Sequence, residues 1–153
     1  LLRQRPLLKG YLPIDAITEG LVNGEIWAAQ IYSGDALGAA ELNPDLRYFV
    51  PREGAPRWVD MLMLSRSSAH PKEVHAFIDY LHRPEVMGKL SEDLYCATPN
   101  AAARALVSKE ILADTGVYPS PEILARCAFF PLIDPAATTN QRSSELWNAL
   151  TAP

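Results

Sequence analysis

The sequence predicts an α/β fold in which a few strands are embedded among many helices. Three apolar runs with strand character, at residues 25–32, 47–50 and 57–64, alternate with segments of helical periodicity. Thirteen prolines and eight glycines divide the 153 residues into short elements. Three strands with exposed edges make a poor isolated sheet, so we expect the chain to belong to a larger fold.

Helices in the first part of the chain are predicted from their starting residues and their apolar spacing. A short helix is expected at residues 15–22, and a second follows a turn at residues 33–35 and runs through Ala40. Pro71 and Pro84 each stand where a proline belongs in the first turn of a helix. Apolar residues follow both prolines at helical spacing, so these segments are expected to be amphipathic.

The second part of the chain contains residues suited to helix capping. Asn100, Ser108 and Ser120 each precede a short helical segment, and their side-chain oxygens can accept from the first free backbone amides. A last helix is expected from about Thr138 to Leu150. The chain is therefore expected to be mostly helical.

Composition and motifs argue against several classes of protein. A net charge of −4 argues against a nucleic-acid partner, which requires a basic face. No apolar run is long enough to span a membrane, and residues 1–13 lack the long apolar core of a secretory signal. No nucleophile, phosphate-binding or dinucleotide motif is present, so neither an enzyme nor a cofactor is expected. Cys96 and Cys127 fit no metal spacing and either pair or remain free and buried.

An aromatic side chain and a carboxylate lie two residues apart in "RWVDMLML" (residues 57–64). Because strand side chains alternate, Trp58 and Asp60 are expected to share one face. An indole beside a carboxylate suits an alkylammonium group, which the ring attracts and the carboxylate neutralises. The alternative is a strand-end aspartate that pairs with an arginine or reaches solvent.

A second such pair is found in "YSGDALGAA" (residues 32–40). Tyr32 ends a predicted strand and Asp35 lies at the start of the following helix. Asp35 either stabilises the helix N-terminus or faces a positively charged ligand. Ligands of open α/β sheets bind beyond the carboxyl ends of strands, which is where both residues are expected. An acid pair of the glycosidase type, Asp35 with Asp60, is a remote alternative.

Several segments in a fixed order resemble the C-terminal half of the bacterial periplasmic polyamine-binding proteins. These are the spermidine/putrescine receptors of ABC transporters, and the resemblance runs from about residue 15 to the end. The segments that carry it are "LVNGEIWAAQIYSGDALGAA", "YFVPREGAPRWVDMLML", "VHAFIDYLHRPEV", "ATPNAAA" and "VYPSPEILARC". The sequence departs from the family at "MLMLSRS", where small residues and a proline usually stand.

The resemblance implies a two-lobed type II periplasmic binding fold with the ligand in the cleft between the lobes. Residues 1–58 would belong to the second lobe, residues 59–118 to the first, and residues 119–153 would return to the second. The N-terminal half of the family fold would be absent from this chain.

The resemblance also implies which residues face the cleft. Aromatic side chains pack on the polyamine, carboxylates pair with its ammonium groups, and a serine is a weaker contact. The aromatic residues are Tyr32, Trp58 and Tyr118, the carboxylates are Asp35 and Asp60, and the serine is Ser33.

Two functions follow as expectations. The first is a periplasmic solute-binding component, or a fragment of one, that binds putrescine or spermidine and works with a membrane permease. Without the rest of the family fold, binding by this chain is expected to be weak. The second is a self-associating structural or interaction protein, in which exposed sheet edges pair two copies and no ligand binds.

Overall fold

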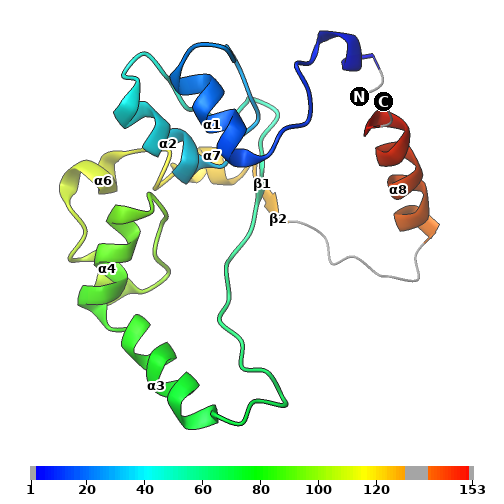
Figure 1. Ribbon diagram of the computed structural model, residues 1–153. Coiled ribbons are helices and arrows are strands. Elements are labelled where there is room, and N and C mark those ends of the chain that lie inside the picture. Colours follow the sequence, from blue (N-terminus) through cyan, green and yellow to red (C-terminus); the bar gives the residue numbers. More distant parts are fainter. Residues whose placement is uncertain (1–2, 130–137, 152–153) are drawn as a thin grey trace.

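The chain is mostly helical, with one small parallel sheet. The computed structural model describes residues 3–129 and 138–151. The elements in these ranges, shown in Figure 1, are a 3-10 turn η1 at Arg5–Leu7, α1 at Ile14–Val22, α2 at Ser33–Leu42, β1 at Pro56–Arg57, α3 at Pro71–Leu81, α4 at Pro84–Asp93, α5 at Ala101–Arg104, α6 at Lys109–Ala113, α7 at Pro121–Leu124, β2 at Ala128–Phe129 and α8 at Thr138–Thr151. This is the partial α/β fold that the sequence predicts.

The predicted helices are confirmed, and their caps form as expected. The Asn100 side chain accepts from the amides of Ala102 and Ala103 at 3.0 and 3.2 Å. The hydroxyls of Ser108 and Ser120 each accept from the amide three residues on, at 3.4 Å. Short polar side chains at these positions thus satisfy backbone amides that the helix leaves free.

The predicted strands are mostly wrong. Residues 25–32 and 47–50 form no strand, and of residues 57–64 only Arg57 does. Pro56 and Arg57 instead pair in parallel with Ala128 and Phe129, a strand that the sequence analysis did not predict. A strand exists only where a neighbour completes its hydrogen bonds, and the described part of the chain supplies none for the other apolar runs.

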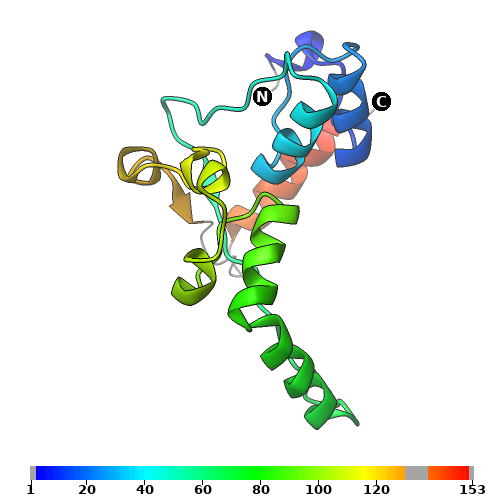
Figure 2. The same ribbon diagram turned by 90° about the vertical axis from the view of Figure 1, so that its left-hand side faces the viewer.

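The core is small and built from small side chains. Helices α1 and α2 lie side by side, as Figure 2 shows, with Leu21, Ala36 and Ala39 buried. Helix α5 approaches α4 at Gly88, where an added Cβ would lie 3.2 Å from the Ala103 carbonyl oxygen. No large side chain in the described ranges is fully buried.

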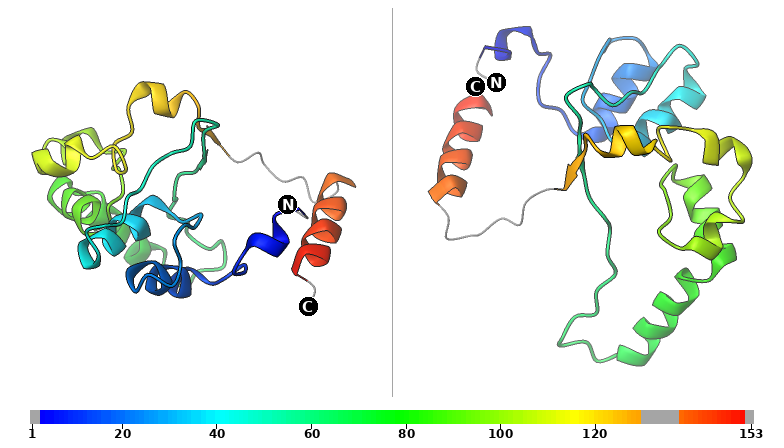
Figure 3. Two further views of the ribbon diagram at one scale, coloured as in Figure 1. Left: turned by 90° about the horizontal axis from the view of Figure 1, so that it is seen from above. Right: turned by 180° about the vertical axis from the view of Figure 1, so that it is seen from behind.

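Two parts of the chain extend away from this core. An extended segment leaves β1 and leads to α3, which continues into α4 (Figure 1). Helix α8 lies beside the N-terminal segment and far from α3 in both views of Figure 3. The rings of Tyr11 and Trp147 meet edge to face with centroids 5.0 Å apart, and Leu150 is buried at the same contact.

The turn before β1 requires a glycine. Gly54 has a φ of +91°, and its amide donates to the Pro51 carbonyl at 2.9 Å. A Cβ at this position would overlap the Arg126 carbonyl oxygen. Because the Ala55 carbonyl accepts from the Ala128 amide at 3.2 Å, the turn also aligns β1 with β2.

We therefore predict that Gly54→Ala destabilises the protein by roughly 2 to 4 kcal/mol, since it adds left-handed strain and a backbone clash. The free energy of unfolding in urea measures this cost. Gly38→Ala is the matched control, because nothing lies within 4 Å of its added Cβ in α2. It should stabilise the helix by up to about 1 kcal/mol. Equal effects of the two substitutions would contradict the prediction.

Candidate ligand-binding site

Two aromatic residues from separate parts of the sequence meet at the start of α2. Tyr32 precedes the helix in extended backbone, and Trp58 directly follows β1. Their rings contact edge to face, with centroids 5.0 Å apart and planes inclined at 69°. Tyr32 is 56% exposed and Trp58 47% exposed, so both rings present surface to solvent. The contact brings together two of the residues implied by the resemblance.

Helix α2 begins three residues earlier than predicted, because residues 33–35 form its first turn and not a separate turn before it. Ser33 is its first residue, so Asp35 lies in the first turn. No side chain caps this terminus, so Asp35 is not a cap of the hydrogen-bonding kind, although the helix dipole favours its charge. Gly34 approaches the turn after α4 so closely that a Cβ would lie 2.7 Å from the Leu94 carbonyl oxygen. The helix start therefore rests directly on that turn.

The turn after α4 is held by several bonds. The Cys96 amide donates to the Ser91 carbonyl at 3.2 Å, and the Tyr95 amide donates to the Glu92 carbonyl at 3.4 Å. Tyr95 takes the left-handed conformation with a φ of 50°, and its phenol donates to Glu41 of α2. The buried Ser91 hydroxyl donates to the Cys96 carbonyl at 2.6 Å. These bonds fix the backbone of the turn at Cys96.

Both predicted carboxylates lie near the Cys96 thiol. The pKa of this thiol is raised first by burial, then by the negative charge of Asp60, and then by that of Asp35. Both aspartates are exposed, and neither forms an ion pair with any residue in the described ranges. The pairing of Asp60 with an arginine, left open by the sequence, is thus not observed. Two aromatic rings and two exposed acids therefore lie around one turn.

Ser33 and Tyr118 occupy different surroundings. The pKa of the Tyr48 phenol is raised, first by burial and then by Cys127, and a hydrogen bond with the Ser33 hydroxyl opposes this shift. The Tyr118 hydroxyl lies 3.1 Å from the Ser91 hydroxyl and accepts from the Thr98 amide at 3.3 Å.

The face of the Tyr118 ring is also engaged, because the Arg104 guanidinium lies 5.0 Å from the ring centroid. In the described part of the chain, no hydrogen bond or ring contact joins Tyr118 directly to Tyr32, Trp58 or Asp60. It reaches their neighbourhood only through Ser91, which bonds to the Cys96 backbone.

The roles of three residues at this site were not predicted from the sequence. Gly34 permits the close approach, Ser91 organises the turn, and Cys96 faces the acids. Cys96 and Cys127 are not bonded to each other. Cys96 is not fully buried, because on the turn after α4 the residue keeps exposed surface while its thiol is partly desolvated. The glycine in "YSGD" was a local signal for close packing, but no local pattern marked Ser91.

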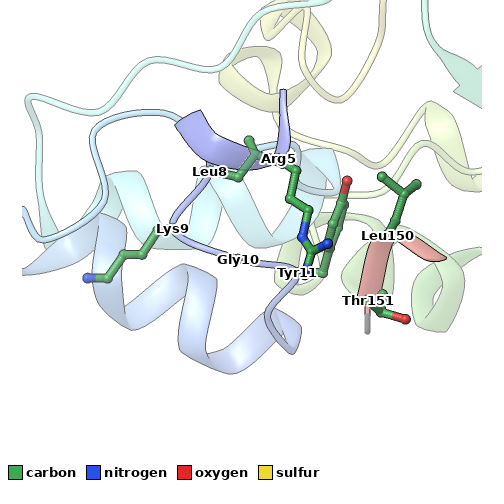
Figure 4. Close-up of a pocket in the computed structure, with 7 residues that line it drawn as sticks. All are labelled: Arg5, Leu8, Lys9, Gly10, Tyr11, Leu150 and Thr151. Atoms are coloured by element: carbon green, nitrogen blue, oxygen red, sulfur yellow. The ribbon is translucent and has the colours of Figure 1, made fainter. Parts of the chain in front are cut away.

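A cavity near the N-terminus lies away from this site. It measures about 310 Å³ and lies between the N-terminal segment and the end of α8, with Tyr11 and Leu150 in its lining (Figure 4). Arg5 and Lys9 also line it, which disfavours a cationic ligand. In the described residues no cluster of side chains suits a metal ion, and no helix combines the length and hydropathy needed to cross a bilayer.

Comparison with known protein families identifies the class to which the chain belongs. The family model of bacterial extracellular solute-binding proteins matches residues 13–118, which is more than half of the chain. The chain therefore belongs to this family. Members of the family serve transport and are not enzymes.

Individual relatives have names that state which ligands they bind. A putrescine-binding periplasmic protein of Pseudomonas aeruginosa is 32% identical over 136 residues, covering 85% of this chain and 36% of the relative. A putrescine-binding periplasmic protein of Escherichia coli is 29% identical over 141 residues, covering 88% and 38%. An Escherichia coli spermidine/putrescine-binding periplasmic protein is 30% identical over 103 residues, covering 67% and 30%. The matched region thus spans between 30% and 38% of the length of these relatives.

The two acids near Cys96 are expected to affect the reactivity of its thiol. In a Cys127→Ala background, Asp60→Asn should lower the pKa of the Cys96 thiol, because a nearby negative charge disfavours the thiolate. At pH 8, below the thiol pKa, the thiolate fraction and the alkylation rate with iodoacetamide should therefore rise. Asp35→Asn should act in the same direction and more weakly.

Asp45→Asn serves as the control, since Asp45 is exposed and does not affect the Cys96 pKa. Its alkylation rate should equal that of the parent protein. Equal rates in the Asp60 and Asp45 variants would show that Asp60 does not face the thiol.

Proposed function

We propose that this chain carries part of the polyamine-binding cleft of an ABC-transporter solute-binding protein. The observation that carries the proposal is the Tyr32–Trp58 contact, with Asp35 and Asp60 exposed beside it and free of ion pairs in the described ranges. Protonated putrescine or spermidine would place methylenes and ammonium groups against the rings and pair its charges with the acids. The names of the relatives support this class of ligand.

The remaining parts of the proposal follow the relatives' fold. Residues 1–58 and 119–153 would contribute to one lobe and residues 59–118 to the other, so Trp58 would stand at the crossing. The protein would act in the periplasm and deliver its ligand to a membrane permease. In this arrangement Tyr118 and Ser33 are secondary contacts, because Ser91, Thr98 and Arg104 engage the former and Tyr48 the latter.

The chain alone is expected to bind polyamines weakly. One cation–π contact contributes about 0.5 to 2 kcal/mol, whereas micromolar affinity requires about 8 kcal/mol. Both acids are exposed, so their attraction for an ammonium group is screened by solvent. Ordering a flexible polyamine has a further entropic cost, and two rings on an open surface do not offset it.

We predict that isothermal titration of the 153-residue chain with putrescine and spermidine gives dissociation constants weaker than micromolar. In a polypeptide that also contains the remaining part of the family fold, binding should be tight, and Asp60→Asn should weaken it roughly 10- to 100-fold. Asp45→Asn is the matched control and should leave affinity unchanged. Tight binding that is insensitive to Asp60→Asn would refute the proposed site.

A second candidate is self-association without a ligand. The many exposed apolar side chains favour it, among them Phe49 at 74% and Met63 at 85% exposure. In this case two copies would cover each other's apolar surface. Sizing chromatography of the chain, with and without putrescine, distinguishes a stable dimer from a monomer.

A further inference from the structure

A chain of hydrogen bonds lies beside the candidate site and passes through two hydroxyl groups. The Ser91 hydroxyl donates to the Cys96 carbonyl at 2.6 Å and lies 3.1 Å from the Tyr118 hydroxyl. The Tyr118 hydroxyl accepts from the Thr98 amide at 3.3 Å. Tyr118 follows α6 in a stretch of chain that passes the end of α4 in Figure 1. Because Ser91 is only 3% exposed, its partners come from the protein rather than from solvent.

The direction of each bond follows from the number of protons available. The Cys96 carbonyl has no proton to donate, so it accepts the single hydroxyl proton of Ser91. The Ser91 oxygen can then only accept from Tyr118, so the phenol donates across the 3.1 Å contact. Because the Thr98 amide donates to the phenol oxygen, all three bonds run in one direction. Hydrogen bonds aligned in this way polarise and strengthen one another.

Tyr118 therefore has little capacity left for a direct polar contact with a ligand. Its proton is used by Ser91, its oxygen accepts from Thr98, and the Arg104 guanidinium lies 5.0 Å from its ring centroid. A guanidinium over a ring competes with any second cation for the same face and repels it. The residue is thus better suited to fixing the protein than to holding a protonated amine.

The other end of the hydrogen-bond chain leads to the candidate site. The Cys96 amide also donates to the Ser91 carbonyl at 3.2 Å, so Ser91 holds the turn after α4 at two points. An added Cβ on Gly34 would lie 2.7 Å from the Leu94 carbonyl oxygen and 3.6 Å from the Cys96 Sγ. The first turn of α2 therefore lies directly against this turn, and a shift of one requires a shift of the other.

We propose that Tyr118 is a positioning residue for the polyamine site, acting through Ser91 on the turn at Cys96 and so on the first turn of α2. Its hydroxyl holds Ser91 in place, and Ser91 holds the turn against which Tyr32 and Asp35 are aligned. The inference rests on the proposed function. It gives the Tyr118 hydroxyl a role that differs from the direct ligand contact that the resemblance implies.

Hydrogen exchange on the 153-residue chain tests the link from Tyr118 to the turn. Tyr118→Phe removes the hydroxyl but keeps the ring beneath Arg104. The Thr98 amide should exchange faster because its acceptor is lost. The Cys96 amide should also exchange faster, roughly three- to tenfold, which corresponds to one neutral hydrogen bond. Ser91→Ala should act on the Cys96 amide in the same way, and the double variant should match Ser91→Ala because both act through one chain of bonds.

Tyr80→Phe is the matched control. Tyr80 also lies beneath a guanidinium, that of Arg83 at 5.5 Å from its ring centroid, but its hydroxyl forms no hydrogen bond within the described residues. This substitution should change neither amide, and circular dichroism should show the same helix content in all variants. If Ser91→Ala does not fold, Tyr118→Phe compared with this control decides alone.

The Cys96 thiol gives a readout that a loss of global stability alone would not move. Burial is the largest cause of its raised pKa. In a Cys127→Ala background, a turn that is held less firmly should expose the thiol more and so lower this pKa. The midpoint of its alkylation–pH profile should therefore move to lower pH in Tyr118→Phe and stay unchanged in Tyr80→Phe.

Affinity in a longer polypeptide separates positioning from contact. That polypeptide contains this chain and the remaining part of the family fold. Tyr118→Phe and Ser91→Ala should each weaken putrescine binding roughly three- to tenfold, and the double variant should bind no more weakly than Ser91→Ala. If the Tyr118 hydroxyl instead contacted the ligand, its removal would weaken binding by the same factor with or without the Ser91 hydroxyl.

The inference is overturned if Tyr118→Phe leaves the Cys96 amide and thiol unchanged, or if the two losses of affinity multiply in the double variant. A longer polypeptide that does not bind putrescine would refute the proposed polyamine site. In that case the exchange and alkylation results still establish or refute the link from Tyr118 to the turn, so the two proposals can fail separately.

Discussion

The site depends on the close approach of Gly34 to the turn after α4. At this point the start of α2 lies against the Leu94 carbonyl, with no room for a side chain between them. The approach brings Tyr32 and Asp35 to the Cys96 turn, which Trp58 and Asp60 reach from β1. The Ser91 hydroxyl stabilises the same turn, because it donates to the Cys96 carbonyl and lies within hydrogen-bond distance of the Tyr118 hydroxyl. The Gly34–Leu94 approach and the Tyr32–Trp58 ring contact thus join three segments that are distant in sequence.

The helices could be predicted from sequence because their signals are local. Pro71 and Pro84 set the backbone angles of a first turn, and Asn100, Ser108 and Ser120 supply the cap oxygens within three residues. The strands could not be predicted in the same way. Apolar character at residues 25–32 and 47–50 indicates burial, but a strand also needs a neighbour, and the described chain offers it only at Pro56–Arg57.

The residue types at the candidate site could be predicted from the sequence, but the contacts that bring them together could not. Residue types alone indicated that Tyr32, Asp35, Trp58 and Asp60 suit a cationic ligand. Their convergence depends on Cys96 and Ser91, and on a glycine whose role appears only when two segments meet. Tyr118 illustrates the opposite case, because a tyrosine suited to a cation already has the Arg104 guanidinium over its ring.

The left-handed backbone at Tyr95 has a consequence for how this region can vary. Glycine or asparagine adopts that conformation at lower cost, yet neither can supply the phenol that reaches Glu41. The position is therefore under two opposing pressures, one from the main chain and one from the link between α4 and α2. A replacement that lowers the backbone strain at Tyr95 removes the hydrogen bond to Glu41. Substitution of Tyr95 should therefore be accompanied by substitution of Glu41.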